Sequence, residues 1–364
     1  MSRNPYASHR ALVPMRKMFN LLSLYADSPV YGWYYGFHPQ VFYFSWCLAN
    51  MCGQPALLVD EDVPRTADVP DYLAFGASAG NMKRRGAKPI AEVAILFSRA
   101  SRDWNRGVPF SPEMLGIAQE LEALHVPYEF IVDDFVTEAQ LAKYRTIFLA
   151  ASQCLADSHI AVLKAFAERG GVVQMSVRAG ELDEHGMKRA SWPFEGLVGP
   201  CGKGRIAYDP EFGGASRAMD ETSPGRPFRP RSYDASSAAA ERVRAKLREI
   251  LGESSWRIDA PENVHVTPWR EADGSRVVLF LNSTGAPEPV AGECPDKGVP
   301  PVPFPSPAKD IVVTLPAEGA TTAVATSPDF AGERPLSVTA NPDGTLTFVL
   351  SRELMKAYAL VRVR

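Results

Sequence analysis

Four short apolar runs that alternate with helical segments constrain the fold of this chain more than any other feature. The runs cover residues 92–97, 128–132, 146–151 and 172–176. The segments between them carry apolar residues at helical spacing or begin, as at Thr137, with a residue that favours a helix N-cap. Strands that alternate with helices in this way form parallel sheets covered on both faces. We therefore predict a flavodoxin-like, doubly wound parallel sheet, with 205–208 as a candidate fifth strand and 235–251 as the closing helix.

Residues 1–62 follow a different pattern and are rich in aromatic side chains. Apolar residues at helical spacing predict a helix over residues 11–26, and residues 30–35 predict a strand. Pro39 suits the first turn of a second helix and Gly53 suits its end, and a short apolar run follows. The order helix, strand, helix, strand is typical of a βα barrel or an open parallel sheet. We interpret this region as the last units of a βα barrel.

The remaining regions are a connector and a β-rich segment. Residues 63–90 are polar and contain several prolines and glycines, which predicts a linker. From residue 257 onward the chain consists of short β-rich runs, separated by turn signals such as Asp273-Gly274 and Asp343-Gly344. This pattern predicts a small antiparallel β-sandwich over residues 257–364. The predicted α/β architecture is a partial βα-barrel remnant at 1–62, a linker at 63–90, a flavodoxin-like region at 91–256 and a β-sandwich at 257–364.

The charge and hydropathy of the chain argue against two classes of partner. Lysine and arginine together number 39, aspartate and glutamate 42, and the net charge is −3. A duplex nucleic-acid binder needs a basic excess, so we expect no nucleic-acid partner. The most apolar stretch, residues 41–58, is interrupted by polar residues and Pro55, so we expect no membrane span. The N-terminus lacks the apolar core of a secretory signal, which favours the cytoplasm.

Neither the five cysteines nor the glycine-poor loops favour a cofactor. The cysteines form no C-x-x-C pair, so we expect neither a disulfide framework nor a zinc site. Cys154 follows a predicted strand, as an amidotransferase nucleophile does, but no glycines flank it to allow the sharp turn, and no H-x-E motif follows. We expect a structural thiol there. The loop 98–102 offers hydroxyls and arginines to an anion but lacks glycine, which favours a solvated loop or a subunit contact. We predict no cofactor and no metal.

The aromatic segment near the N-terminus suggests a carbohydrate site. Sugar-binding clefts combine aromatic faces with a few carboxylates. If the two predicted strands belong to a βα barrel, both groups of side chains lie at its carboxyl-terminal face, where barrel enzymes act. The predicted substrate-binding residues are Trp33, Tyr34, Tyr35 and His38 after one strand and Asp60 and Glu61 after the next. The alternative interpretation is a buried aromatic cluster between the barrel and a neighbouring domain.

Several stretches of the middle region agree with one known arrangement. They are EVAILFSRASRDW, LGIAQELEALHVPYEFIVDD, YRTIFLAASQCLADSHIAVLKAFAERGGVVQMS, GELDEHGMKRASWPFEGLVG and GKGRIAY. In this order they resemble the amidotransferase-like trimerisation domain of β-galactosidases of glycoside hydrolase family 42. APENVHVTPWREADGSRVVLFLNSTG is similar to the start of the C-terminal β-domain of these proteins, and SWCLANMCGQPALL to the last helix and strand of their barrel. The resemblance implies a carbohydrate substrate and a homotrimer.

The sequence departs from the family in its barrel. A complete βα barrel takes about 250 residues, but fewer than 100 precede the trimerisation-like region. The family's catalytic acid follows a strand that has no counterpart here, and no glutamate stands at the end of residues 30–35 to act as nucleophile. We therefore expect the C-terminal part of a β-galactosidase-like glycoside hydrolase that is inactive alone. The alternative is a non-catalytic carbohydrate-binding or assembly protein.

Overall fold

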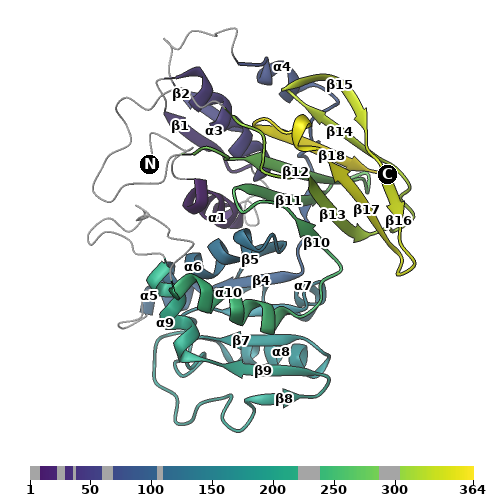
Figure 1. The fold of residues 1–364 in the computed structure, drawn as a ribbon. Coiled ribbons are helices and arrows are strands. Elements are labelled where there is room, and N and C mark those ends of the chain that lie inside the picture. The colour runs from purple at the N-terminus through teal and green to yellow at the C-terminus, as the bar shows by residue number, and fades with distance from the viewer. Residues whose placement is uncertain are drawn as a thin grey trace. The chain divides into compact units, whose positions relative to one another are not determined.

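The computed structural model describes residues 9–22, 29–35, 38–59, 69–104, 110–219, 238–286 and 304–364. The chain divides into two compact units (Figure 1). Unit 1 comprises the chain up to Ile90, Glu122–Pro127 and Glu253–Arg364, and unit 2 comprises Ala91–Leu121 and Tyr128–Gly252. The predicted first and last regions contribute to one unit.

The core of unit 2 is a six-stranded sheet. Its strands are β4 (Val93–Phe97), β5 (Tyr128–Val132), β6 (Thr146–Leu149), β7 (Val172–Met175), β8 (Gly199–Cys201) and β9 (Gly204–Tyr208). Their order is β5-β4-β6-β7-β9-β8, and every pairing is parallel except that of β8 with β9. The five parallel strands follow the 2-1-3-4-5 order of the flavodoxin type. The doubly wound sheet expected from the alternating apolar runs is present.

Helices lie on both faces of this sheet. The helices of unit 2 are α5 (Arg99–Trp104), α6 (Phe110–Ala123), α7 (Glu138–Leu141), α8 (Asp157–Glu168), α9 (Pro210–Met219) and α10 (Ala238–Leu251), with a 3₁₀ turn at Asp133–Phe135. Leu163 of α8 shares a core with Ile147 of β6. The next residue, Phe148, points to the opposite face and contacts Phe212 of α9 at 6.1 Å between ring centroids. Thr137 caps α7 as expected by accepting from Gln140 N.

In unit 1 the N-terminal segment forms a βαβ arrangement preceded by a helix. Its elements are α1 (His9–Phe19), a 3₁₀ turn (Asn20–Leu22), β1 (Gly32–Tyr35), α3 (Pro39–Met51) and β2 (Ala56–Val59). Every residue of α3 from Val41 to Met51 is buried, as expected for a helix that is apolar on all sides. The chain leaves α3 through Gly53, which has a φ of 74° and lies so close to Trp269 that a Cβ would be 2.5 Å from its ring. Only glycine satisfies both conditions.

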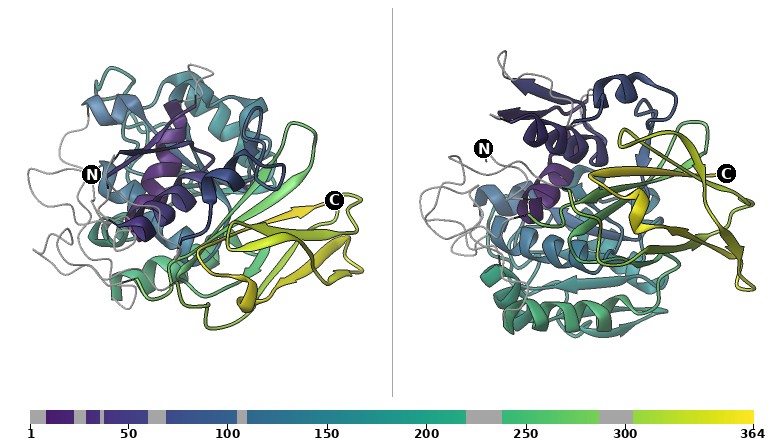
Figure 2. Two further views of the ribbon diagram at one scale, coloured as in Figure 1. Left: turned by 90° about the horizontal axis from the view of Figure 1, so that it is seen from above. Right: turned by 45° about the horizontal axis from the view of Figure 1, so that its top comes forward.

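Two mainly antiparallel sheets complete unit 1. One has the order β15-β14-β18-β12-β11-β3 and the other β10-β13-β17-β16. Their strands are β3 (Lys88–Pro89), β10 (Arg257–Asp259), β11 (Val264–Arg270), β12 (Arg276–Asn282), β13 (Ile311–Pro316), β14 (Ala323–Ser327), β15 (Phe330–Pro335), β16 (Val338–Ala340), β17 (Thr345–Leu350) and β18 (Tyr358–Val363). A 3₁₀ turn lies at Arg352–Leu354. Most of these strands are coloured green to yellow in Figure 2.

The side chains of the central strand β12 belong to two different cores. Val278 and Phe280 belong to a core with side chains of the second sheet, including Phe348 of β17. Their neighbours Leu279 and Leu281 belong to a different core, together with α3. Successive strand residues point to opposite faces, so β12 is covered on one face by the second sheet and on the other by α3.

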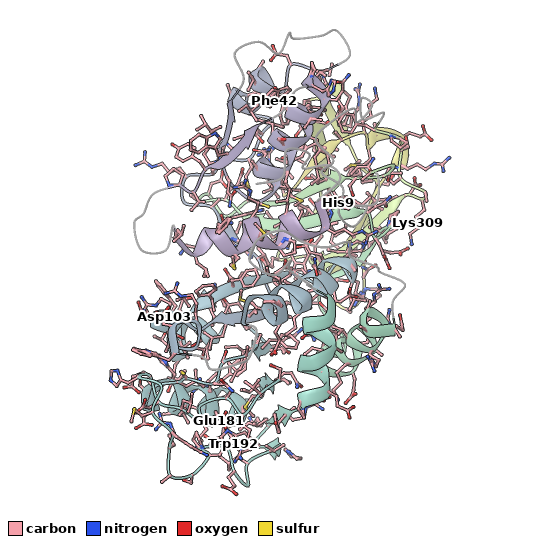
Figure 3. All side chains as sticks on the ribbon, turned by 90° about the vertical axis from the view of Figure 1, so that its left-hand side faces the viewer. His9, Phe42, Asp103, Glu181, Trp192 and Lys309 are labelled. Atoms are coloured by element: carbon pink, nitrogen blue, oxygen red, sulfur yellow. The ribbon has the colours of Figure 1, made fainter. Side chains whose placement is uncertain are left out.

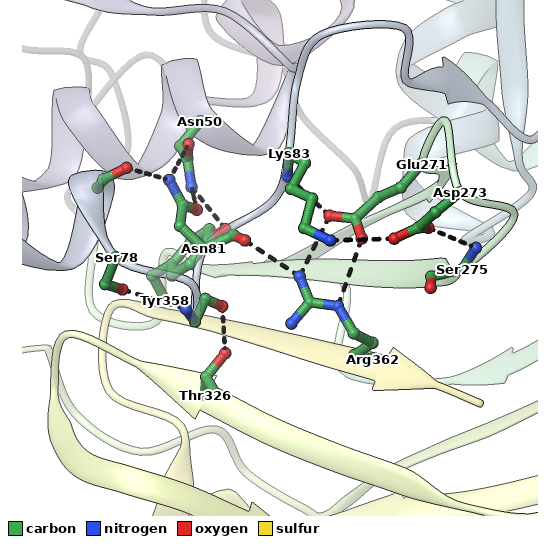
Figure 4. A network of polar contacts seen from close by, with 12 residues as sticks. Asn50, Ser78, Asn81, Lys83, Glu271, Asp273, Ser275, Thr326, Tyr358 and Arg362 are labelled. Atoms are coloured by element: carbon green, nitrogen blue, oxygen red, sulfur yellow. Dashed lines mark hydrogen bonds and ion pairs between the residues drawn. The ribbon is translucent and has the colours of Figure 1, made fainter.

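The structure differs from the sequence prediction in the segment 63–90, expected to be a linker. Its described part, 69–90, contains α4 (Tyr72–Ala77) and β3, which pairs with β11. A buried polar network joins it to the sheet: Asn81 contacts Asn50 of α3, and Arg362 of β18 donates to the Asn81 carbonyl at 3.0 Å (Figure 4). Proline and glycine mark the turns of this segment, but its partners are distant in sequence and leave no local signal. Among the described residues, no helix combines the length and apolar character that crossing a bilayer requires.

Candidate functional site

The βαβ arrangement positions the residues predicted to bind a substrate. β1 and β2 run parallel, with Trp33 beside Leu57 in the register and Gly32 N donating to the Pro55 carbonyl at 2.8 Å. Pro39 opens α3 directly after β1, as its place in the sequence predicted. Within the described part of the chain, these two strands pair only with each other.

The two faces of this small sheet have different surroundings. Ala56 and Leu58 of β2 pack against the core that contains α3. Leu57 and its register neighbour Trp33 are 47% and 44% exposed. Because side chains alternate along a strand, Trp33 and Leu57 lie on the face that points away from α3. Two large apolar side chains, Trp33 and Leu57, are therefore partly exposed on this face.

The structure places the predicted site residues as follows. Trp33 lies on this exposed face, and the exposed His38 precedes α3 at the carboxyl end of β1, where its carbonyl accepts from Val41 N at 3.0 Å. Tyr34 and Tyr35 are in β1, but the structure describes only their backbones. Asp60 and Glu61 lie outside the described residues. Trp33 is the second residue of the four-residue strand β1, and His38 follows the carboxyl end of that strand.

The aromatic side chains of α3 are part of the core of unit 1. Phe42, Tyr43, Phe44 and Trp46 are all buried. Tyr43 stacks on Tyr72 with 5.3 Å between ring centroids, and Trp46 contacts Tyr358 of β18 edge-on at 5.6 Å. These side chains are structural, because they fill the core between α3, α4 and the antiparallel sheet. Of the tyrosine and tryptophan side chains that the structure describes in residues 31–46, Tyr31 and Trp33 are exposed.

Sequence reasoning missed Arg16, which contacts the outer edge of β1. Its guanidinium donates to the backbone carbonyls of Tyr31 at 3.5 Å and Trp33 at 3.3 Å. In a parallel pair, alternate residues direct their backbone groups to opposite sides. Gly32 bonds toward β2, so the carbonyls of Tyr31 and Trp33 point to the edge where another strand would pair. A basic residue at the end of an amphipathic helix gives no sequence signal for this contact.

The sharp turn that an amidotransferase nucleophile needs exists in unit 2, but at a different residue. Ala151 follows β6 with a φ of 50°, a left-handed conformation that is strained for alanine. Its N–H donates to Glu113 Oε1 at 2.7 Å and to Ser176 Oγ at 3.2 Å. Cys154, three residues later, is buried, and burial raises the pKa of its thiol. The strained position thus carries a methyl group, and the thiol nearby has the environment of a structural cysteine.

Residues 98–102, expected to form a loop, belong to the helix α5 from Arg99 onward, and their donors bond within the protein. The Asp133 carboxylate accepts from the backbone N–H groups of Arg99 and Ala100 at 2.7 and 3.3 Å. The hydroxyls of Ser98 and Ser101 donate to the Cys154 carbonyl. The side chains of Arg99 and Arg102 pair with Asp134 and Asp103. An anion would have to compete with all of these contacts.

Other sites proposed or excluded from the sequence can be located as well. Cys47, Cys52 and Cys154 are free and buried, and Cys201 is free and half-buried; Cys294 lies outside the described residues. The described ranges contain no group of three or more histidine, cysteine, aspartate or glutamate side chains placed to hold a metal ion.

Comparisons with known proteins give matches at the level of structure. No protein-family model matches the sequence, and no curated protein matches it significantly. The fold is similar to that of α-L-fucosidase isoenzyme 2 from Paenibacillus thiaminolyticus, with a TM-score of 0.60, 15% identity, and 96% of this chain and 63% of that chain covered. It is also similar to a β-galactosidase from Rahnella sp. R3, with a TM-score of 0.56, 11% identity, and 100% and 59% covered.

A third similar structure is Gan42B, a β-galactosidase of glycoside hydrolase family 42 from G. stearothermophilus. The TM-score is 0.52 at 11% identity, and 99% of this chain and 57% of that chain are covered. At these identities the likeness concerns the fold: this chain has a mixed α/β fold of the kind found in these glycoside hydrolases. The chain spans about three fifths of the length of the three similar proteins.

Proposed function

We propose that this chain is the C-terminal part of a β-galactosidase-like glycoside hydrolase that acts on carbohydrate. In this proposal β1, α3 and β2 are the last units of a βα barrel, and the antiparallel sheets of unit 1 form a C-terminal β-sandwich. Unit 2 supports assembly. The chain alone is inactive, because it lacks the strands that carry the catalytic acid and the nucleophile.

The observation that carries the proposal is the exposed apolar face of β1 and β2. Parallel sheets occur almost only with both faces covered. Here α3 packs against one face, and on the other Trp33 and Leu57 are 44% and 47% exposed. In a βα barrel the helices lie outside and the side chains opposite to them fill the barrel interior. The two strands therefore have the side-chain arrangement of barrel strands whose interior neighbours come from another polypeptide segment.

The chemistry that the chain would contribute follows from the same placement. Barrel enzymes bind substrate at the carboxyl ends of their strands. His38 follows that end of β1, Trp33 lies within β1, and Asp60 and Glu61 follow β2 in the sequence. An indole ring suits the apolar face of a pyranose, and carboxylates accept from sugar hydroxyls. Hydrolysis requires a positioned acid and a second carboxylate, which we assign to the missing strands.

We also propose that unit 2 mediates a homotrimer. Trp104 of α5 and Met187 are 52% and 66% exposed. They belong to one surface region, since a Cβ on Gly186 would lie 2.8 Å from Trp104 Cβ. Exposed apolar patches of this kind are typical of protein interfaces. The donors of residues 98–102 are bonded within the protein, which disfavours an anion site there. The strained turn carries Ala151, which is not a nucleophile. Subunit contact is therefore the role that we favour for unit 2.

The second candidate function is a non-catalytic carbohydrate-binding protein, favoured by the exposed Tyr31 and Trp33. Two measurements separate the candidates. The nucleotide sequence upstream of the Met1 codon should encode the preceding barrel strands, and co-expression of that polypeptide with this chain should give turnover of nitrophenyl glycosides. The second candidate instead requires that the chain alone binds sugar. Binding should then quench tryptophan fluorescence, and W33A should abolish this quenching.

The proposal also predicts no turnover by the chain alone. Hydrolysis of nitrophenyl galactoside by the purified chain would overturn it if D60N or E61Q removes that activity while D273N, a change at an exposed carboxylate of the C-terminal segment, does not. Such a result would place a complete catalytic pair within these 364 residues.

A further inference from the structure

A chain of buried polar side chains connects α1 to the antiparallel sheet of unit 1. His9 Nδ1 lies 2.7 Å from His265 Nε2, and His265 Nδ1 lies 3.3 Å from Glu122 Oε2. All three residues are buried, and His9 is labelled in Figure 3. His265 belongs to β11, and Glu122 to the segment Glu122–Pro127 of the same unit. His9 and His265 are 256 positions apart in the sequence.

The contacts determine which nitrogen carries each proton. An ionised carboxylate only accepts, so His265 Nδ1 must donate to Glu122. The neutral His265 ring then has an accepting Nε2, and His9 Nδ1 must donate to it. The relay therefore runs from His9 through His265 to Glu122. If both rings carry an added proton, each facing nitrogen is a donor with no acceptor, and the hydrogen bond between the two rings is lost.

The charged groups around the relay come from four segments. On α1, Lys17 forms a buried ion pair with Glu122, Arg16 lies in the same turn, and Arg10 pairs with Glu262 at 3.6 Å. His125 Nε2 donates to the Ala260 carbonyl at 2.9 Å, and the buried Cys52 lies at the end of α3. The carboxylate of Glu122, which contacts His265, is already paired with Lys17. A positive charge added to His265 or His9 is therefore poorly compensated.

The direction of each pKa shift agrees with this arrangement. Burial lowers the pKa of His9 well below its usual value, and the neighbouring His265 and Arg10 act in the same direction. Burial also lowers the pKa of His265, against the opposing effect of Glu122. Burial alone would raise the pKa of Glu122, but Lys17 and His265 lower it to about 2. Between pH 7.5 and 5 the carboxylate therefore stays ionised, and only the histidines respond.

We propose that the His9–His265–Glu122 relay is an acid-sensitive latch. It holds α1 against the rest of unit 1 at neutral pH and releases this helix as the pH falls. The contacts lie at both ends of the helix, at His9 in the first turn and at Lys17 in the last. Arg16 on the same helix contacts the outer edge of β1. Release of α1 therefore also uncovers the edge at which a further strand can pair. This device goes beyond the proposed function and does not depend on it.

The sign and size of the effect follow from proton linkage. A histidine whose pKa is lowered in the docked state binds its proton only after release, so docking weakens as the pH falls below about 6.5. For each histidine kept neutral in the docked helix, the equilibrium for release rises about 30-fold between pH 7.5 and pH 5. Two such histidines set an upper limit of roughly 1000-fold.

Amide hydrogen exchange of the full chain tests the latch. After correction for the intrinsic pH dependence, exchange in residues 12–19 should accelerate at least about 10-fold from pH 7.5 to pH 5, while β12 and β18 stay protected. H9Q/H265Q keeps hydrogen-bonding groups at both positions but cannot titrate, so its α1 should show no such acceleration. The matched control H125Q replaces a buried histidine outside the relay and should keep the wild-type response.

Three outcomes would overturn the latch. The first is exchange in α1 that does not depend on pH, and the second is a double variant that responds to acid as the wild type does. The third is acceleration in β12 and β18 equal to that in α1, which would mean that unit 1 opens as a whole. If H9Q/H265Q does not fold, H9Q alone serves in its place, because it removes one of the two titrating rings and should lower the response about 30-fold at most.

Discussion

Replacing Glu271 by glutamine should cost far more stability than replacing a neighbouring exposed carboxylate. Glu271 is fully buried and forms two contacts with Arg362 of β18, at 3.1 and 3.4 Å, and the Arg362 side chain is 6% exposed. Its carboxylate also accepts from Lys83 N at 2.7 Å (Figure 4). E271Q leaves the guanidinium of Arg362 buried without a counter-ion, which costs about 3–5 kcal/mol.

The matched control is D273N, two residues along the chain. Asp273 pairs with Lys83 at 3.0 Å, but the two side chains are 47% and 65% exposed. An exposed pair of this kind contributes little to stability, because water and salt screen it. Urea unfolding followed by tryptophan fluorescence measures both variants, with the slope of each transition compared to confirm that the same surface unfolds. Removing both buried charges in E271M/R362M should cost less than E271Q alone. Equal losses in E271Q and D273N would refute the reasoning, since they would show that the buried arginine needs no counter-ion.

Three further predictions concern unit 2. A151G should leave the free energy of unfolding unchanged or raise it by up to about 1 kcal/mol, because glycine adopts the left-handed φ of Ala151 without strain. The control A161G, on the exposed face of α8, should instead lower the free energy of unfolding by about 1 kcal/mol. Thermal melts distinguish the two variants. G116A should destabilise unit 2 severely, since a Cβ on Gly116 would lie 1.9 Å from the Ser216 carbonyl oxygen of α9; a melting temperature within a few degrees of the wild type would contradict this packing. Light scattering of the full chain should give the mass of a trimer that W104S shifts toward monomer, and a wild-type monomer at micromolar concentration would remove the trimer proposal.

The sequence by itself determined the strands β4, β5, β6 and β7 of unit 2, but it did not predict α5, β8 or α9. The apolar run at 128–132 is a strand with the expected bounds, and the other three runs contain β4, β6 and β7. Local rules were sufficient there, because hydrophobic periodicity and terminal signals such as Thr137 and Pro39 act over a few residues. The polar character of 69–90 concealed α4 and β3, because their partners lie near residues 269 and 358.

The candidate site shows where local information ends. The sequence identified the aromatic segment, but only the tertiary structure separated the exposed Trp33 from the buried Tyr43 and Trp46, because burial depends on which face α3 covers. The contact of Arg16 with β1 and the relay from His9 to His265 join residues that periodicity does not connect. The strained turn after β6 fell on Ala151, three residues before Cys154, because backbone conformation is imposed by the sheet and by Glu113. Sequence patterns determine which residues form helices and strands, whereas packing over long sequence separations decides which side chains meet.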